Sequence, residues 1–353
     1  MNLSAREWKE FKINNIFETI KDDTQVPTGA YIEKKYLTAG STPRITVTSS
    51  NNGVDDFWDT KHENKREYEN FISVNFLGDA FYQPYSATLD MKVHCLKVKN
   101  KELDEILALF LCGVLLNNTK NSTYGNQLSS KDIIRKSILL PVDKSGKPDY
   151  QFMKDYISAI QKTKLEKYKQ YCRMQLHELG EYKSIEPLSI KTCEPFFITD
   201  IFDIPKRGKR IIAENYIDGD MPVVSSAGGN NGVIAFAGNQ DKVRIYEDCL
   251  SVANGGVSAG FAFYHPYPFI ATDHVTHFKG KLNRYHYMFL GTIIRNQLHE
   301  KYDFNREMTD PRLKREKLLV PVTEEGKLDF DYMEQYIKNL MIKKYESYLD
   351  YKK

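Results

Sequence analysis

The sequence contains few cysteines, and their spacing joins none of them into a recognisable framework. The 353 residues include only five cysteines. An odd number at wide intervals, with no Cys-x-x-Cys pair, argues against a disulfide framework and against a zinc module. We therefore expect a reduced protein with no metal site in this chain. The five are Cys95, Cys112, Cys172, Cys193 and Cys249.

Long apolar runs are also missing. No stretch of about 18 apolar residues occurs, as a membrane-spanning helix would require. The first residues, Met1 to Ser4, lack the basic segment and apolar run that mark a signal peptide. These two absences predict a cytoplasmic protein.

The chain has little net charge. Its 50 Lys and Arg residues against 47 Asp and Glu residues give a formal charge of +3. This excludes a uniformly basic protein that coats DNA, but it is compatible with local basic patches. Hydrophobic residues make up 41% of the chain, enough for a buried core, and the length suggests roughly two domains. The 23 tyrosines favour a large interface, because tyrosine is half apolar and half hydrogen-bonding.

Catalytic motifs are absent as well. A methyltransferase would need a glycine-rich cofactor loop and an Asn-Pro-Pro-Tyr-like motif, and neither is found. The glycine-rich segment 254–260 lacks the Lys-Ser/Thr ending of a phosphate loop, so we interpret it as a close turn. His274 and His277 have metal-ligand spacing beside Asp273, but the first half of the chain has no matching set. We therefore expect a binding protein with no catalytic residues.

What is present is an internal repeat. The segment Phe11–Phe17 (FKINNIF) returns as Phe196–Phe202 (FFITDIF), and Phe81–Tyr85 (FYQPY) returns as Phe263–Tyr267 (FYHPY). Six such blocks occur twice in the same order, at offsets near 180 residues (for example 263 − 81 = 182). A repeat this long indicates a duplicated domain rather than a solenoid of short units. The remaining blocks include Ser49-Ser50…Asn51-Asn52-Gly53-Val54 with Ser225-Ser226…Asn230-Asn231-Gly232-Val233, and Leu139–Val142 with Leu319–Val322.

Each copy has two parts. Short alternating apolar runs with Asn-Gly turns predict a mixed α/β domain in an α+β chain. An i, i+3, i+4, i+7 apolar stripe then predicts a long helix. We place the first domain at 1–150, a central helix at 151–180, a linker at 181–194, the second domain at 195–330 and a C-terminal helix at 331–353.

The two helices carry matching stripes, and we expect them to pack as an antiparallel, coiled-coil-like pair. The alternative is that each helix only covers the core of its own domain. A helix of about 25 residues spans nearly 40 Å, which is longer than that role requires. The stripe residues are Met153, Ile157, Ile160 and Tyr168 on the first helix, and Met333, Ile337, Leu340 and Tyr348 on the second.

Two α/β modules, each followed by a long helix, resemble the specificity (S) subunits of type I restriction-modification enzymes. The repeated blocks look closer to the shorter specificity subunits of BcgI-like type IIB systems. The resemblance implies two target recognition domains that each contact half of a split site in double-stranded DNA. It also implies that the helices act as a ruler and as the docking surface for DNA adenine methyltransferase subunits, with or without a nuclease or restriction subunit.

On this resemblance no cofactor is expected in this chain, and S-adenosylmethionine and magnesium are expected on the partner subunits. Two alternatives stay open. The chain could be a stand-alone DNA-modifying enzyme with an unrecognised site, or a duplicated module that binds something other than DNA.

The duplication suggests which residues contact DNA. Residues kept in both copies serve the fold, the phosphates or the partner, whereas divergent residues are free to read different bases. A solvated charge run is the competing interpretation of the basic segments. The divergent candidates are Lys61, Lys65, Arg66, Asn126, Gln127, Lys206, Arg207, Lys209, Arg210, Asn305 and Arg306. The shared polar residues Ser49, Asn51, Asn52, Ser225, Asn230 and Asn231 are interpreted first as turn formers and second as DNA-backbone contacts.

Overall fold

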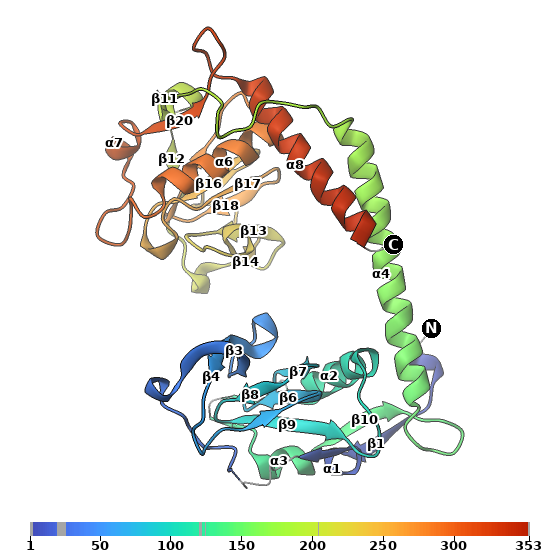
Figure 1. The fold of residues 1–353 in the computed structure, drawn as a ribbon. Helices are drawn as coiled ribbons and strands as arrows, with labels where there is room; N and C mark the ends of the chain where they lie inside the picture. Colours follow the sequence, from blue (N-terminus) through green and yellow to red (C-terminus); the bar gives the residue numbers. More distant parts are fainter. Residues whose placement is uncertain (1–2, 20–25, 120–121, 124, 204, 352–353) are drawn as a thin grey trace. The chain divides into compact units, whose positions relative to one another are not determined.

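A computed structural model describes residues 3–19, 26–119, 122–123, 125–203 and 205–351. The chain divides into two compact units, Met1–Tyr168 and Lys169–Lys353 (Figure 1). The division falls inside the long helix α4 (Tyr150–Leu179), so the last turns of α4 belong to the second unit.

The first unit is built on two four-stranded sheets, with strand orders β2-β9-β6-β7 and β4-β3-β8-β5. All neighbouring strands are antiparallel except β3 and β8. A separate ribbon pairs β1 with β10. The strands are β1 (Trp8–Lys12), β2 (Phe17–Thr19), β3 (Thr38–Ile45), β4 (Val54–Asp59), β5 (Glu67–Tyr68), β6 (Phe71–Asn75), β7 (Ala80–Gln83), β8 (Ala87–Leu89), β9 (Val93–Val98) and β10 (Ser137–Pro141).

Helix α2 packs against β7 and β10 and buries the main core of this unit. The helices are α1 (Ile13–Ile16), α2 (Glu105–Thr119), α3 (Ser130–Arg135) and the first part of α4, with 3-10 turns η1 (Leu3–Ala5), η2 (Lys34–Tyr36) and η3 (Asn51–Gly53).

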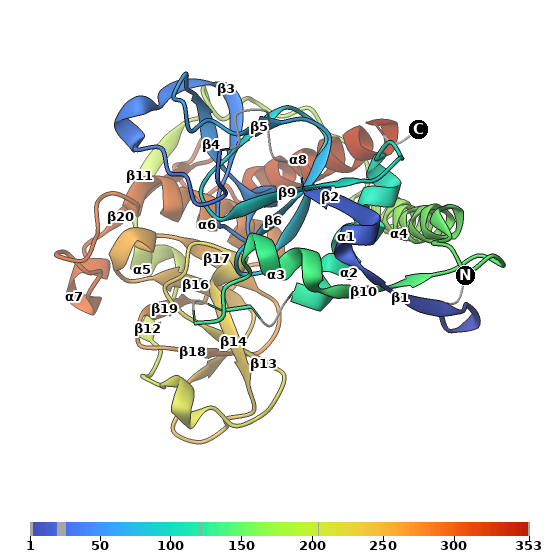
Figure 2. The ribbon, with the colours of Figure 1, turned by 90° about the horizontal axis from the view of Figure 1, so that it is seen from below.

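The second unit repeats this topology strand for strand. Its sheets have the orders β12-β19-β16-β17 and β14-β13-β18-β15, and β11 pairs with β20. In both views β13 and β14 lie at the margin of this unit (Figures 1 and 2). The strands are β11 (Cys193–Phe197), β12 (Lys206–Arg207), β13 (Met221–Val224), β14 (Val233–Ala237), β15 (Ile245–Tyr246), β16 (Cys249–Ala253), β17 (Ala262–His265), β18 (Phe269–Ala271), β19 (Val275–Phe278) and β20 (Lys317–Pro321).

Its helices follow the same plan. They are α5 (Ile198–Ile201), α6 (Arg284–Leu298), α7 (Asp310–Leu313) and α8 (Phe330–Tyr351), with 3-10 turns η4 (Ala213–Asn215), η5 (Asn230–Gly232) and η6 (Gly256–Ser258). Helix α6 packs against β17 and β20, as α2 does against β7 and β10. The predicted fold class, two duplicated mixed α/β domains each followed by a long helix, is confirmed.

The two Asn-Asn-Gly blocks form the turns that join β3 to β4 and β13 to β14. Asn51 and Asn52 have φ values of 48° and 56°, and Asn230 and Asn231 have values of 49° and 52°. Asparagine tolerates this left-handed region better than other residues that carry a Cβ. In each turn the first asparagine also donates from its side-chain amide to the carbonyl three residues on, at 3.1 Å. Sequence and backbone therefore agree at these turns.

The first turns of each long helix cover their own domain. Met153 is buried in the core of the first unit, with Ile157 packed against it, and Met333 is buried in the core of the second. Each helix follows the last strand of its unit after a short turn, and its first apolar positions lie over the core of that unit. The prediction that Met153 packs against the other helix is therefore wrong, and Ile157 also packs on the core of its own unit.

The contact between α4 and α8 in the second unit uses later residues of α4. Leu179 and Ile342 are buried together with Tyr285 of α6, and Leu176 and Met341 pack beside them. Tyr171 meets Tyr345 edge to face, with ring centroids 6.0 Å apart. As residue numbers rise along α4 they fall along α8, so the contacting turns run antiparallel. Of the predicted stripe only Ile337 takes part in this cluster, whereas Leu340 is 49% exposed and Tyr168 is 42% exposed.

The linker between α4 and β11 is attached to α8 by a buried amide. Asn339 donates to the carbonyl of Lys183 at 2.6 Å and accepts from the Lys183 N–H at 3.2 Å. The hydroxyl of Tyr332 donates to the carbonyl of Glu186 at 2.9 Å. These bonds explain why a polar residue interrupts the buried face of α8.

The packing of α4 on α8 gives a matched pair of test sites on one helix. Ile342→Ala should lower the free energy of unfolding of the second unit by about 2–4 kcal/mol, because it removes buried methylenes and leaves a cavity. Leu340→Ala, on the exposed side of α8, should change it by less than about 0.5 kcal/mol. Urea unfolding followed by tyrosine fluorescence measures both. Equal effects would show that the cluster around Ile342 is not packed as described.

A buried histidine distinguishes the two copies. His265 is fully buried in β17, and its Nε2 lies 2.8 Å from the Ser251 hydroxyl. The matching pair in the first unit is Gln83 and Ser73, joined at 3.1 Å. Burial lowers the pKa of His265 to about 4, because a charged imidazole there would lose its hydration.

This burial predicts a pH dependence that one substitution should remove. As the pH falls from about 6.5 to about 4, the unfolded chain takes up a proton on His265 that the folded chain does not. The contribution of the neutral His265 to the free energy of unfolding is therefore fully present above this window. It is lost as the pH falls through the window, by on the order of 3 kcal/mol. His265→Gln, which copies Gln83, should reduce this loss, whereas the exposed His274→Gln should not. Identical pH profiles of unfolding for the wild type and His265→Gln would contradict the assignment.

Candidate nucleic-acid interface

The basic segment of the second unit is held at the edge of a sheet. Lys206 and Arg207 form β12, which pairs with β19. The following N–H of Lys209 donates to the carbonyl of Ala271 at 2.9 Å. With the backbone fixed in this way, the side chains of Lys206, Lys209 and Arg210 are exposed to solvent.

Arg207 is half-buried and joins β12 to the loop before α7. Its guanidinium donates to the carbonyl of Met308 at 2.9 Å and lies 3.4 Å from a carboxylate oxygen of Glu307. The backbone carbonyl of Arg207 accepts from Arg244 at 2.5 Å and from the Tyr246 hydroxyl at 3.0 Å. Arg207 therefore holds structure together in addition to contributing charge.

The loop 303–307 places two other predicted residues beside this segment. The carboxylate of Asp303 accepts from the N–H groups of Asn305 and Arg306, at 2.7 and 2.8 Å, and so stiffens the turn. The guanidinium of Arg306 lies 5.4 Å from the ring centre of Tyr302, and both loop side chains point outward. Through the Arg207–Glu307 ion pair, the structure brings β12 next to the loop that carries Asn305 and Arg306.

In the first unit the predicted residues separate. Arg66 is only 4% exposed, and its guanidinium donates to the backbone carbonyls of Val93 (2.9 Å) and Asp90. The prediction that Arg66 contacts DNA is therefore wrong, because the side chain fastens the loop before β9. Lys65 forms an ion pair with Glu67, whereas Lys61 is exposed.

Asn126 and Gln127 lie in the segment before α3. Both are exposed, and Gln127 accepts from the Lys92 ammonium at 3.0 Å. Asn126 exchanges backbone hydrogen bonds with Thr123 at 3.0 and 3.1 Å, which closes a tight turn. Tyr124, which accompanies them in the sequence, lies outside the described residues.

The serines and asparagines that both copies share lie in the turns that join β3 to β4 and β13 to β14. Ser225 accepts from the Thr272 hydroxyl at 3.0 Å, and its N–H donates to the Gly232 carbonyl at 2.9 Å. Ser49 is exposed. Asn52 donates to the Tyr82 carbonyl at 2.9 Å, a bond by which the turn is fastened to β7.

Sequence reasoning missed a set of exposed aromatic residues near these turns. Phe57 and Phe236 are 50% and 60% exposed, and Tyr85 and Tyr267 are 39% and 38% exposed. They occupy matching positions in the two copies. These residues are apolar and occur in both copies, and that pattern could have drawn attention to them in the sequence. Matching positions alone, however, indicate only the repeat and do not show which side chains are exposed.

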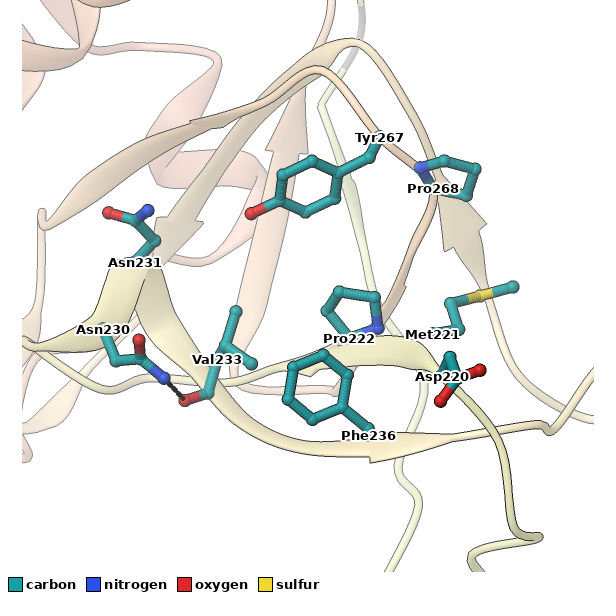
Figure 3. Close-up of a pocket in the computed structure, with 9 residues that line it drawn as sticks. All are labelled: Asp220, Met221, Pro222, Asn230, Asn231, Val233, Phe236, Tyr267 and Pro268. Atoms are coloured by element: carbon teal, nitrogen blue, oxygen red, sulfur yellow. Dashed lines mark hydrogen bonds between the residues drawn. The ribbon is translucent and has the colours of Figure 1, made fainter. Parts of the chain in front are cut away.

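One of these aromatic pairs borders a cavity of about 590 Å³ in the second unit. Figure 3 shows the ring of Tyr267 on one side and those of Pro222 and Phe236 on the other. Asn231 and Asp220 lie at its margins.

Within the described ranges, no three or more His, Cys, Asp or Glu side chains gather closely enough to hold a metal ion. No helix in the part of the chain that the structure describes is long and apolar enough to cross a membrane.

A family comparison identifies the repeated unit. The model of the type I restriction modification DNA specificity domain matches residues 5–170 and again residues 190–347. The chain belongs to this family. The two matched segments correspond to the two units, each with its long helix.

Individual relatives agree with this assignment. The chain is 31% identical over 163 residues to the type II restriction enzyme specificity subunit S.BcgI from Heyndrickxia coagulans, and the match spans 45% of each protein. The crystal structure of the type I restriction-modification S subunit from M. genitalium superposes over 99% of this chain and 93% of that one, with a TM-score of 0.53 and 16% identity. The similarity to the M. genitalium structure shows a common fold.

Because the chain belongs to a DNA specificity family, we predict that the basic segment 206–210 contributes to DNA binding. Neutralising Arg207 and Arg210 to Gln should weaken binding to duplex DNA and flatten its salt dependence, by about one unit of slope for each phosphate that the variant no longer neutralises. Arg207→Gln alone should also lower stability, because Met308 and Glu307 lose their partner. Arg210→Gln alone should change only the binding.

Fluorescence anisotropy at increasing salt concentration measures both affinity and slope. Lys327→Gln, an exposed cation in the turn before α8, is the matched control. Unchanged affinity and slope in the double variant would make the segment an ordinary solvated surface.

Proposed function

We propose that this chain is the DNA sequence-specificity subunit of a restriction-modification complex. Each domain reads half of a bipartite site in double-stranded DNA, and the chain itself catalyses no reaction. The observation that carries the proposal is the presence of two copies of the specificity domain, built on one scaffold but with different polar loops.

The differences between the copies are those that reading two half-sites requires. The second domain gathers exposed lysine, arginine and asparagine side chains at β12 and at the loop 303–307. The first presents Lys61 and the turn containing Asn126 and Gln127 on an equivalent framework. Arginine and lysine recognise guanine edges or phosphates, and asparagine and glutamine recognise adenine edges.

Catalysis would then reside on partner subunits. The middle turns of α4 present a groove of about 330 Å³ lined by Tyr156, Ile160 and Lys164, among others. Because Ile160 is not used by the core of its own unit, we assign this part of α4 to docking a DNA adenine methyltransferase subunit, alone or fused to a nuclease. S-adenosylmethionine and magnesium would bind to those partners. A complex that modifies cellular DNA places the chain in the cytoplasm.

The test is to compare the chain alone with the chain and its methyltransferase partner. The purified chain, given S-adenosylmethionine, magnesium and duplex DNA, should neither methylate nor cleave. Co-expression with the partner should produce a split methylated motif, detected by single-molecule sequencing. Turnover by a rigorously partner-free preparation would instead support a stand-alone enzyme.

A double variant tests whether the two halves are read separately. Asn305→Ala with Arg306→Ala should relax one half of the methylated motif, because both side chains project from one domain, and leave the other half unchanged. Loss of specificity in both halves would contradict the assignment of one half-site to each domain.

A further inference from the structure

The cavity beside β13 and β14 has two flat walls. Pro222 and Phe236 are cross-strand partners, so their rings form one continuous surface. Tyr267, which follows β17, faces this surface across the cavity (Figure 3). With Phe236 60% exposed, an apolar wall is open to any flat ligand of suitable size.

Three polar groups at the margin of this cavity are unused. The Asp220 carboxylate, the Asn231 amide and the Tyr267 hydroxyl make no hydrogen bond or ion pair with any residue that the structure describes. In Figure 3 the hydroxyl of Tyr267 and the amide of Asn231 lie toward one end, and Asp220 lies toward the other. The cavity therefore offers stacking faces together with hydrogen-bonding groups at its rim.

The first domain keeps the wall residues but not the carboxylate. Pro43 and Phe57 are cross-strand partners there, as Pro222 and Phe236 are in the second domain. Asn52 and Tyr85 match Asn231 and Tyr267, but Ser41 stands where the second domain has Asp220 (220 − 41 = 179 and 236 − 57 = 179). In the first domain Asn52 and Tyr85 border a cavity with Glu105 and Leu109 of α2 instead, so the cavity walled by Pro222, Phe236 and Tyr267 is described for the second domain.

A nucleobase fits this combination. Proteins hold an unstacked base between aromatic or apolar side chains and read its edge with polar groups. A carboxylate accepts from an exocyclic amino group, which cytosine, adenine and guanine carry. Thymine offers only its N3–H, which lies between two carbonyl oxygens that repel the carboxylate. A base within a duplex exposes only its edges, so a base held between these walls must leave the stack.

We propose that the second domain holds an unstacked nucleobase with an exocyclic amino group between Tyr267 and the Pro222–Phe236 pair. Asp220 accepts from that amino group and sets the preference. This inference rests on the proposed DNA-reading function and adds a site within it. An apolar side chain of a partner protein would use the two walls but not the Asp220 carboxylate, whereas a base with an amino group uses both.

The experiment measures binding of the full chain to fluorescein-labelled single-stranded oligonucleotides of equal length, made of deoxycytidine, deoxyadenosine or deoxythymidine. The deoxycytidine and deoxyadenosine strands should bind about tenfold more tightly than the deoxythymidine strand. Phe236→Ala and Tyr267→Ala should each weaken deoxycytidine binding about tenfold, because one stacking face is removed. Phe236→Trp should retain the affinity.

Asp220→Ala separates reading from stacking. It should abolish the preference over deoxythymidine while leaving stacking-dependent binding in place. Leu319→Ala, which removes an apolar side chain of similar exposure on β20, should have no effect. Equal binding of the three strands by the wild type, or unchanged binding by the variants at Phe236 and Tyr267, would overturn the proposal.

The result is separable from the proposed function. If the variants at Phe236, Tyr267 and Asp220 bind the three strands as the wild type does but the assembled complex loses methylation, the cavity contacts the methyltransferase and not a base. If methylation of a split motif is never found while these variants behave as expected, the base-binding site stands and the wider function falls.

Discussion

Each domain depends on the pairing of its first strand with its last strand and on the carboxylate that follows. In the first unit Trp8 lies opposite Pro141, and in the second Cys193 lies opposite Pro321. After a turn from this strand, the carboxylates of Asp149 and Asp329 each accept from the N–H three residues on, at 2.9 and 3.0 Å. They therefore cap α4 and α8 at their first turns, where a negative charge is favourable.

A cation from the opposite end of each module reinforces this junction. Arg6 contacts Asp149 at 3.5 Å and lies 4.5 Å from the ring centre of Phe152. In the second copy Lys191 contacts Asp329 at 2.9 Å and lies 5.0 Å from the ring centre of Tyr332. The start of each module thus fixes the point at which its long helix departs.

The sequence predicts the architecture well because each element of the fold leaves a matching pattern in both copies of the repeat. The duplicated fold, the Asn-Gly turns and the long helices follow from matched blocks and local chemistry. The errors lie where tertiary burial decides the role of a residue. In the sequence Arg66 belongs to a basic run, but in the structure its side chain is buried and donates to the backbone carbonyls of Asp90 and Val93. An apolar stripe likewise does not tell whether Met153 faces its own core or another helix, because both environments are apolar.

The glycine-rich segment 254–260 shows how packing can imitate a ligand-binding motif. A Cβ at Gly260 would lie 2.6 Å from the backbone nitrogen of His299, so glycine is required where the segment crosses the end of α6. In the first domain Gly78 occupies the equivalent position at the end of α2, and a Cβ added there would lie 2.3 Å from the Thr119 carbonyl oxygen. The backbone carbonyl of Asn254, at the start of the segment, accepts from the N–H of Met308 at 2.7 Å and thereby anchors the loop 303–307. Close packing of the backbone is therefore sufficient to explain the glycine at position 260. At Gly255 a Cβ would lie 2.9 Å from Glu307 and 3.5 Å from the Asp303 carbonyl oxygen, so this glycine lets the backbone approach the polar loop closely. A loop held in this way before binding loses less conformational entropy when it meets its target.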